Sequence, residues 1–169
     1  DARSKLKNWR RKRMSEEEIV RAKSPIPFSA GFRWSVGEVM EHFIKSLGER
    51  KILGGKCPRC GYTYVPPRNR CGKCYSEIKP ENLTELSGKG VLVGYTIAHV
   101  ELDGVGNIKD LEEPLVIGAV KLDGADSTIF VPIGEVKPEE VKSGMRVEVA
   151  WREETKGEIG DIKYFKPAG

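Results

Sequence analysis

The stretch CPRCGYTYVPPRNRCGKC, residues 57–74, contains two Cys-x-x-Cys pairs separated by ten residues. Two residues between thiolates let one tight turn direct both sulfurs at one ion, and two facing turns form a tetrahedral four-thiolate cage. Gly61 and Gly72 are expected to supply the strained backbone that such turns need. The spacing therefore predicts one metal site, whose ligands are the chain's only cysteines: Cys57, Cys60, Cys71 and Cys74.

Zinc is the metal that this ligand set favours, because four cysteines close the site and leave no open position for a catalytic water. Two disulfides or free thiols are the alternatives to a metal, and iron with the same four ligands would make a rubredoxin-like one-electron carrier. Few side chains between Leu53 and Ile78 can pack together, and so small a module needs a staple to fold. Loss of one cysteine is therefore expected to unfold the ribbon.

A helix and a strand are expected directly before the cysteines. Residues 36–47 place apolar side chains on one helical stripe, Ser35 and Glu38 form a capping-box pattern, and Gly48 ends the helix. His42 lies opposite the stripe and is expected to face solvent. Residues 51–56 then read as a short strand that leads into the metal site.

Five short strands are expected after the cysteines, at residues 90–100, 115–122, 128–133, 145–152 and 159–165. Asp123-Gly124 is typical of a hairpin turn between the second and third strands. Residues 137–141 predict one helical turn between the third and fourth strands, which suits an OB-type barrel. The acidic, glycine-containing stretch at residues 101–114 is expected to be a mobile loop.

These elements predict a mainly β protein with N-terminal helices, in which a rubredoxin-like zinc ribbon precedes a five-stranded OB-type barrel. The expected divisions are a basic arm with helices at 1–48, the ribbon at 49–80 and the barrel at 81–169. Hydrophobic residues make up 38% and charged residues 32%, which suits a soluble domain. Because the apolar runs are short and no secretory leader is seen, we expect a cytoplasmic protein that does not span a membrane.

Charge divides the chain into basic and acidic parts. Residues 1–23 carry a net +5, residues 24–44 −1, residues 45–80 +7 and residues 81–169 −7. A nucleic-acid binder needs basic charge and stacking aromatics on its barrel, and the acidic second half does not meet that expectation. Nucleic-acid binding therefore stays as the alternative function. It rests on the arm at residues 1–23, which also reads as a frayed tail or as a segment that folds against a partner.

The motifs taken together resemble a known family, the acyl-CoA-associated zinc-ribbon/OB-fold proteins once classed as a domain of unknown function. The resemblance covers roughly residues 32–167 and is most specific at the cysteine pairs and at Pro66-Pro67-Arg68. Weaker similarities follow at Gly88-Lys89-Gly90-Val91, Tyr95-Thr96, Pro114-Leu115, Leu122-Asp123-Gly124 and Gly144-Met145-Arg146-Val147. The basic arm lies outside it.

The resemblance implies a non-catalytic accessory subunit of a thiolase-type acyl-CoA acyltransferase complex. Its partner would be a thiolase-superfamily catalytic subunit, in a hetero-oligomer with paired large and small subunits, and the complex would bind a CoA thioester. The residues agree, because thiolytic chemistry needs a cysteine nucleophile with a base, and a metal that takes every cysteine leaves none. Only His42 and His99 could act as imidazole bases, and His99 lies in an expected strand.

Four cations of the ribbon are candidates for contact with the CoA phosphates or with an acidic partner surface: Arg59, Arg68, Arg70 and Lys73. A simpler interpretation is that Arg68 braces the ribbon. Phe28, Phe32 and Trp34 cluster before the helix, and we expect the first 50 residues and the ribbon to supply much of the surface that a partner buries.

Overall fold

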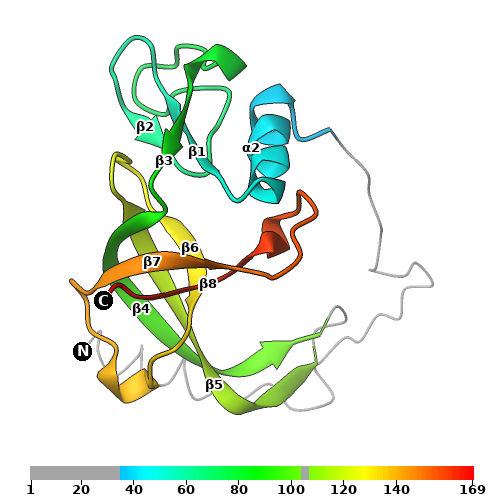
Figure 1. The fold of residues 1–169 in the computed structure, drawn as a ribbon, viewed down its shortest axis with the longest axis vertical. Helices are drawn as coiled ribbons and strands as arrows, with labels where there is room; N and C mark the ends of the chain where they lie inside the picture. The colour runs from blue at the N-terminus through cyan, green and yellow to red at the C-terminus, as the bar shows by residue number, and fades with distance from the viewer. Residues whose placement is uncertain (1–34, 104–106) are drawn as a thin grey trace, which may run out of the picture. The chain divides into compact units, whose positions relative to one another are not determined.

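The computed structural model describes residues 35–103 and 107–169, and Figure 1 shows how their elements follow one another. Within these residues one α-helix precedes a three-stranded sheet of order β2-β1-β3 and a closed five-stranded barrel of order β4-β5-β6-β8-β7. The mainly β class is therefore confirmed, while the basic arm at residues 1–23 and the aromatics Phe28, Phe32 and Trp34 lie outside this part of the chain. The bounds are α2 Glu38–Gly48, β1 Ile52–Lys56, β2 Thr63–Tyr64, β3 Leu83–Leu86, β4 Lys89–Leu102, β5 Ile108–Leu122, β6 Ile129–Ile133, β7 Arg146–Trp151 and β8 Ile162–Pro167, with short 3-10 helices η2 Pro80–Asn82, η3 Pro138–Glu140 and η4 Ile159–Asp161.

Helix α2 buries the predicted apolar stripe, with Val39, Phe43 and Leu47 almost fully covered. The predicted capping box is wrong. Gly37 is the N-cap at φ 81°, and no side chain caps the helix, because the Ser35 hydroxyl instead accepts the N–H of Gly37 at 3.3 Å. His42 is exposed, as expected. None of the helices within residues 35–103 and 107–169 is long and apolar enough to cross a membrane.

The barrel closes around a core to which alternate residues of each strand contribute. In β5, Val116, Val120 and Leu122 are buried while Lys121 between them is exposed. Strands β5 and β6 pair antiparallel, which confirms the predicted hairpin. Strand β8 lies between β6 and β7, and its parallel contact with β6 at Ile133↔Phe165 completes the circle of five strands.

The prediction of a loop at residues 101–114 is wrong over most of its length. Strand β4 continues to Leu102 and β5 begins at Ile108, so the two strands pair well past the barrel as a hairpin arm. Leu102 lies directly opposite Ile108, and on the other face Lys109 Nζ lies 3.3 Å from Glu101 Oε1. The acidic side chains fit a strand here because both faces of a projecting ribbon meet water.

The last strand begins later than predicted, because residues 159–161 form η4 instead of strand. Asp161 explains that turn. The residue is 3% exposed, and its carboxylate accepts three backbone N–H groups, from Lys156 at 3.0 Å, Gly157 at 2.8 Å and Glu158 at 3.0 Å. The predicted helical turn between the third and fourth barrel strands is confirmed as η3.

The ribbon sheet is attached to the barrel through the β5–β6 turn, residues 123–128. Thr63 and Asp126 exchange hydrogen bonds, since the Asp126 carboxylate accepts the Thr63 N–H at 2.9 Å and Thr63 O accepts the Asp126 N–H at 2.9 Å. The Ser127 hydroxyl accepts the Val65 N–H at 2.7 Å and donates to Val65 O at 3.1 Å. The turn therefore extends the pairing of β2 and fixes the cysteine-bearing segment against the barrel.

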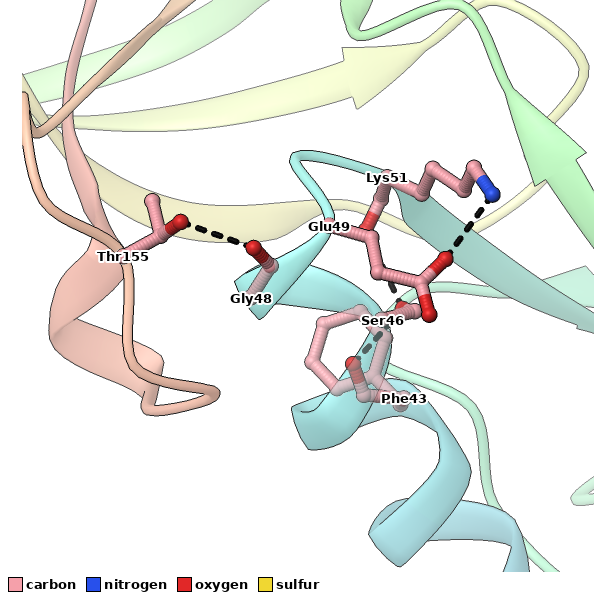
Figure 2. Close-up of polar contacts among 6 residues, drawn as sticks. All are labelled: Phe43, Ser46, Gly48, Glu49, Lys51 and Thr155. Atoms are coloured by element: carbon pink, nitrogen blue, oxygen red, sulfur yellow. Dashed lines mark hydrogen bonds and ion pairs between the residues drawn. The ribbon is translucent and has the colours of Figure 1, made fainter.

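Helix α2 docks by its C-terminal end, as Figure 2 shows. The Ser46 hydroxyl donates to Phe43 O at 2.8 Å and to Lys51 O at 3.0 Å, which holds the chain as it leaves the helix. The Thr155 hydroxyl, from the segment after β7, donates to Gly48 O at 2.7 Å. The helix is therefore joined both to the start of the ribbon and to the barrel.

Candidate metal centre

Two matching turns carry the cysteine pairs. In the first turn the Gly61 N–H donates to Cys57 O at 2.9 Å, and in the second the Tyr75 N–H donates to Cys71 O at 3.0 Å. Backbone N–H groups also point at sulfur, from Cys60 to Cys57 Sγ at 3.5 Å and from Lys73 to Cys71 Sγ at 3.4 Å. The chain therefore builds the same local structure twice.

Glycine is needed in only one of the two places where it was predicted. The residue after each second cysteine adopts the left-handed conformation, and that residue is Gly61 at φ 73° in the first turn but Tyr75 at φ 59° in the second. Gly72 does not adopt a positive φ. Its N–H donates to Tyr64 Oη at 2.9 Å, so its role is a close backbone contact with that tyrosine.

The four sulfurs converge as the spacing predicts. All four Sγ atoms lie within 4.8 Å of one another, with Cys57–Cys74 and Cys60–Cys71 each at 3.5 Å. A tetrahedral zinc site with Zn–S bonds of about 2.3 Å would place its sulfurs about 3.8 Å apart, so the arrangement fits zinc. No pair is bonded as a disulfide, and all four cysteines are free thiols here.

Two hydroxyl groups favour thiolates at this centre. Ser76 Oγ lies 3.0 Å from Cys57 Sγ, and its hydrogen bond lowers the pKa of Cys57 to about 5. Tyr64 Oη lies 3.5 Å from Cys71 Sγ, and its hydrogen bond lowers the pKa of Cys71 to about 7. Both sulfurs are thus prepared to bind a cation, because the thiolate is the metal ligand.

The pKa of Cys60 is shifted in the opposite direction. The backbone N–H of Tyr62 favours its thiolate, yet desolvation and the neighbouring sulfurs together raise the pKa of Cys60 to about 12. Four sulfurs this close cannot all carry charge without a cation among them. A divalent ion removes that repulsion and displaces the remaining protons, which is the chemistry that a four-cysteine donor set selects.

The predicted cationic residues surround this centre on exposed positions. The Arg68 guanidinium lies 4.7 Å from the centroid of the Tyr64 ring, and Lys73 Nζ lies 4.3 Å from that of Tyr62. The two rings are themselves in contact, with centroids 4.6 Å apart. Arg68 and Lys73 therefore brace the ribbon through its tyrosines, which agrees with the simpler interpretation of Arg68.

The other two cations differ from each other. Arg70 donates from Nη1 to Tyr75 O at 3.3 Å, so it holds the loop that carries the second cysteine pair. Arg59 lies between the cysteines of the first pair and is exposed. A contact between any of the four cations and CoA phosphate stays a prediction.

Two of the weaker sequence similarities, in the β5–β6 turn and at the start of β7, each contribute one partner of an ion pair. Arg146, from the start of β7, donates from Nη1 and Nη2 to Asp123 Oδ1 and Oδ2 at 2.8 and 2.6 Å. Hydrogen bonding to Arg146 holds the pKa of Asp123 below its ordinary value. The pairing links the β5–β6 turn to β7, close to the turn residues that hold the ribbon.

A four-cysteine ribbon attached to a closed five-stranded barrel defines a zinc-ribbon/OB-fold protein. Two family models match in this order, the rubredoxin-like zinc ribbon domain of ChsH2 at residues 45–80 and the C-terminal OB-fold domain of ChsH2 at residues 83–152. The chain belongs to the DUF35 family, which confirms the resemblance seen in its sequence.

Known relatives share this family, and solved structures share this fold. A DUF35 domain-containing scaffold protein of Methanocaldococcus jannaschii is 36% identical over 122 residues, which cover 69% of this chain and 81% of the relative. A protein of the same description from Pyrococcus furiosus is 31% identical over 117 residues, covering 69% and 78%. A DUF35 protein of Sulfolobus solfataricus matches at TM-score 0.52 and 28% identity, covering 67% and 78%. The Ltp2-ChsH2(DUF35) aldolase matches at TM-score 0.59 and 20% identity, covering 81% and 100%, and so shows the fold alone.

Proposed function

We propose that this protein is a non-catalytic, zinc-binding accessory subunit of a thiolase-type acyl-CoA acyltransferase complex. The relatives from Methanocaldococcus jannaschii and Pyrococcus furiosus are described as scaffold proteins, which favours a structural role for this chain in a complex. The Ltp2-ChsH2(DUF35) aldolase is a case in which a chain of this fold is named together with an enzyme. The acidic barrel, −7 over residues 81–169, argues against the nucleic-acid alternative.

One observation carries the non-catalytic part of the proposal. The chain has four cysteines, and all four sulfurs lie within 4.8 Å of one another. An ion held there uses every thiol, so none is left to act as the nucleophile of thioester chemistry. A closed four-thiolate site also offers no position for a metal-bound water.

Cys57, Cys60, Cys71 and Cys74 would hold the ion, which supplies structural cross-linking. Ser76 lies 3.0 Å from both Cys57 Sγ and Cys74 Sγ and would orient these two sulfurs. The buried core of the ribbon around the cage is small, formed by Cys57, Cys71, Tyr64 and Ile78. The ion therefore holds together a segment that its apolar side chains alone could not.

Contact with the CoA phosphates belongs to the same proposal, with Arg59, Arg68, Arg70 and Lys73 as candidates. Arg59 is the strongest of them, since the others already contact tyrosine rings or the backbone of the ribbon. We would replace each cation by alanine and measure acyl-CoA affinity of the assembled complex. Unchanged affinity in all four variants would remove this part of the proposal.

The accessory role is tested by co-expressing the chain with the thiolase-type subunit from the same source organism. We expect the two to purify together, the pair to turn over an acyl-CoA, and this chain alone to be inactive. Cys60→Ser is the matched variant, which should lose the metal and the association together. Turnover by the isolated chain, or no association between the two wild-type subunits, contradicts the proposal.

Metal identity needs its own measurement. Elemental analysis of the purified chain should find one zinc per polypeptide, and the solution should be colourless. A red iron-thiolate spectrum would instead support the electron-carrier alternative.

A further inference from the structure

Tyr75 is held in a backbone conformation that its side chain disfavours. It follows Cys74 at φ 59°, where the matching residue of the first turn is Gly61 at φ 73°. A Cβ atom makes the left-handed conformation unfavourable, and glycine avoids that strain. The first turn shows that glycine builds this structure, so the fold itself does not require a tyrosine at position 75.

The Tyr75 side chain differs from those of the other described non-glycine residues with positive φ. Among the described residues, Arg50 and Glu135 are the other non-glycines with positive φ, at 60° and 56°. Both use their side chains within the fold, since Arg50 Nη2 donates to Glu153 O at 2.9 Å and the Glu135 carboxylate accepts the Tyr164 hydroxyl at 2.6 Å. Within the described residues, the Tyr75 side chain makes no hydrogen bond of this kind, and it is 76% exposed.

Tyr75 belongs to a basic segment, although Glu77, which forms a β-bridge with Arg70, also lies near it in the sequence. Arg70 donates to Tyr75 O, Lys73 precedes it by two residues, and Arg59 lies in the facing turn. The segment of residues 45–80 carries a net +7. An exposed tyrosine on a basic segment has the composition of an interface hot spot, where tyrosine and arginine are enriched. Strain of this kind is found where a binding role maintains it.

We propose that Tyr75 is the anchor by which the ribbon docks into an acid-rimmed pocket of the catalytic subunit. This inference rests on the proposed function, which supplies that subunit. The occupant is a protein surface and not a small molecule, because a side chain 76% exposed projects outward and fills a pocket on something else. The net +7 charge of residues 45–80 favours a partner surface that carries carboxylates.

Tyr75→Gly is the decisive variant, because it removes the ring and the strain together. We expect the dissociation constant between the zinc-loaded full chain and the purified thiolase-type subunit to rise about 30-fold. Zinc retention against a chelator and the midpoint of thermal unfolding should be unchanged or higher. If Tyr75 merely held the ribbon together, its replacement would lower both the zinc retention and the midpoint of thermal unfolding.

Two further variants make the test specific. Tyr75→Phe keeps the ring and should bind within about threefold of the wild type, since the aromatic area is retained. Phe130→Ser removes an aromatic side chain of equal exposure, 75%, from the barrel and should leave the dissociation constant unchanged. Binding by the wild type should weaken as salt is added, in keeping with a charged rim.

The outcomes separate this inference from the function on which it rests. If the wild-type chain does not bind the catalytic subunit, the proposed function fails and the anchor has no partner. If the wild type and Tyr75→Gly bind equally well, the anchor is wrong while the proposed function stands. A Tyr75→Gly complex that assembles normally but binds acyl-CoA weakly would place the ring on the nucleotide, which also overturns protein docking.

Discussion

At the scale of single residues, Asp161 shows how one carboxylate organises a loop. Burial by itself would raise its pKa, but the N–H groups of Glu158, Lys156 and Gly157 outweigh burial and hold the pKa of Asp161 below its ordinary value of 3.8. These hydrogen bonds shape the segment after β7, which Thr155 joins to the end of α2. The charged form of Asp161 therefore supports the docking of the helix.

Replacing Asp161 by asparagine should weaken the fold, because one of the oxygens that accept backbone N–H groups becomes an amide that donates. We expect Asp161→Asn to lower the midpoint of thermal unfolding by roughly 5 °C at neutral pH. The folded pKa is depressed, so the stabilisation is complete above the ordinary value of 3.8 and is lost as the pH falls through the lower folded value. Circular dichroism melts over a pH series measure the difference.

Glu154→Gln, at an exposed position of the same loop, is the control and should melt like the wild type. Equal midpoints for Asp161→Asn and the wild type at neutral pH contradict the prediction. A difference between the midpoints of Asp161→Asn and the wild type that persists in strong acid also contradicts the prediction.

At the scale of elements, the join between α2 and the loop after β7 depends on close backbone approach. A Cβ atom placed on Gly48 would lie 2.9 Å from the backbone nitrogen of Gly157. Gly157 itself has φ 77°, so the opposing segment is in a conformation that few other residues adopt. The glycine predicted to end the helix thus also sets how closely the helix packs.

A methyl group at position 48 should separate the two segments. Alanine normally stabilises a helix relative to glycine, but here the clash is with backbone, which cannot move aside as a flexible side chain would. We expect Gly48→Ala to reduce the free energy of unfolding by about 1–3 kcal/mol, measured by urea titration.

Gly160→Ala is the matched control, because a Cβ at Gly160 meets nothing within 4 Å. It should unfold at the same urea concentration as the wild type. A Gly48→Ala protein as stable as the control would show that the contact with Gly157 is not tight in solution.

At the scale of the whole molecule, part of the ribbon packs into the hydrophobic core of the barrel, while the residues around the cysteines form a separate small cluster. Ile52 and Val65 from the ribbon belong to the same buried cluster as Leu92, Val147 and Phe165 of the barrel. The hydrogen bonds of Asp126 and Ser127 to the ribbon strand add a polar connection. Disorder in the ribbon should therefore reach the barrel.

Removing the metal is expected to destabilise both parts. Stripping zinc with a chelator should speed hydrogen exchange in peptides of the ribbon and, to a smaller extent, in those of β5 and β7, measured by mass spectrometry. Adding zinc back should restore protection, and the same chelator presaturated with zinc is the control. Full protection of the barrel after zinc is lost would contradict the shared core.

Local patterns in the sequence predicted what depends on local chemistry. The cysteine spacing indicated the cage, the short strand segments and the Asp123-Gly124 turn indicated the barrel, and the stripe of α2 indicated its buried face. Each of these follows from neighbours within a few residues, where spacing fixes the geometry.

Features that depend on distant partners were missed. The contacts of Asp126 with Thr63 and of Ser127 with Val65 join residues about 60 positions apart, which no local pattern contains. The arm beyond the barrel has acidic strands because no core covers it, so its composition reads as a loop. Tyr75 could have been found by aligning the two cysteine turns, where it occupies the place of Gly61.

The position of β8 in the barrel governs the order in which a newly made chain can complete its fold. β8 lies between β6 and β7, so the barrel cannot close until Pro167 has left the ribosome. The four cysteines and the strands of the ribbon are complete at Leu86, about 80 residues and roughly 4–16 s earlier at ordinary rates of translation. During that interval the nascent chain can capture its ion while β6 and β7 still have unpaired edges, and this is when it is most open to mispairing.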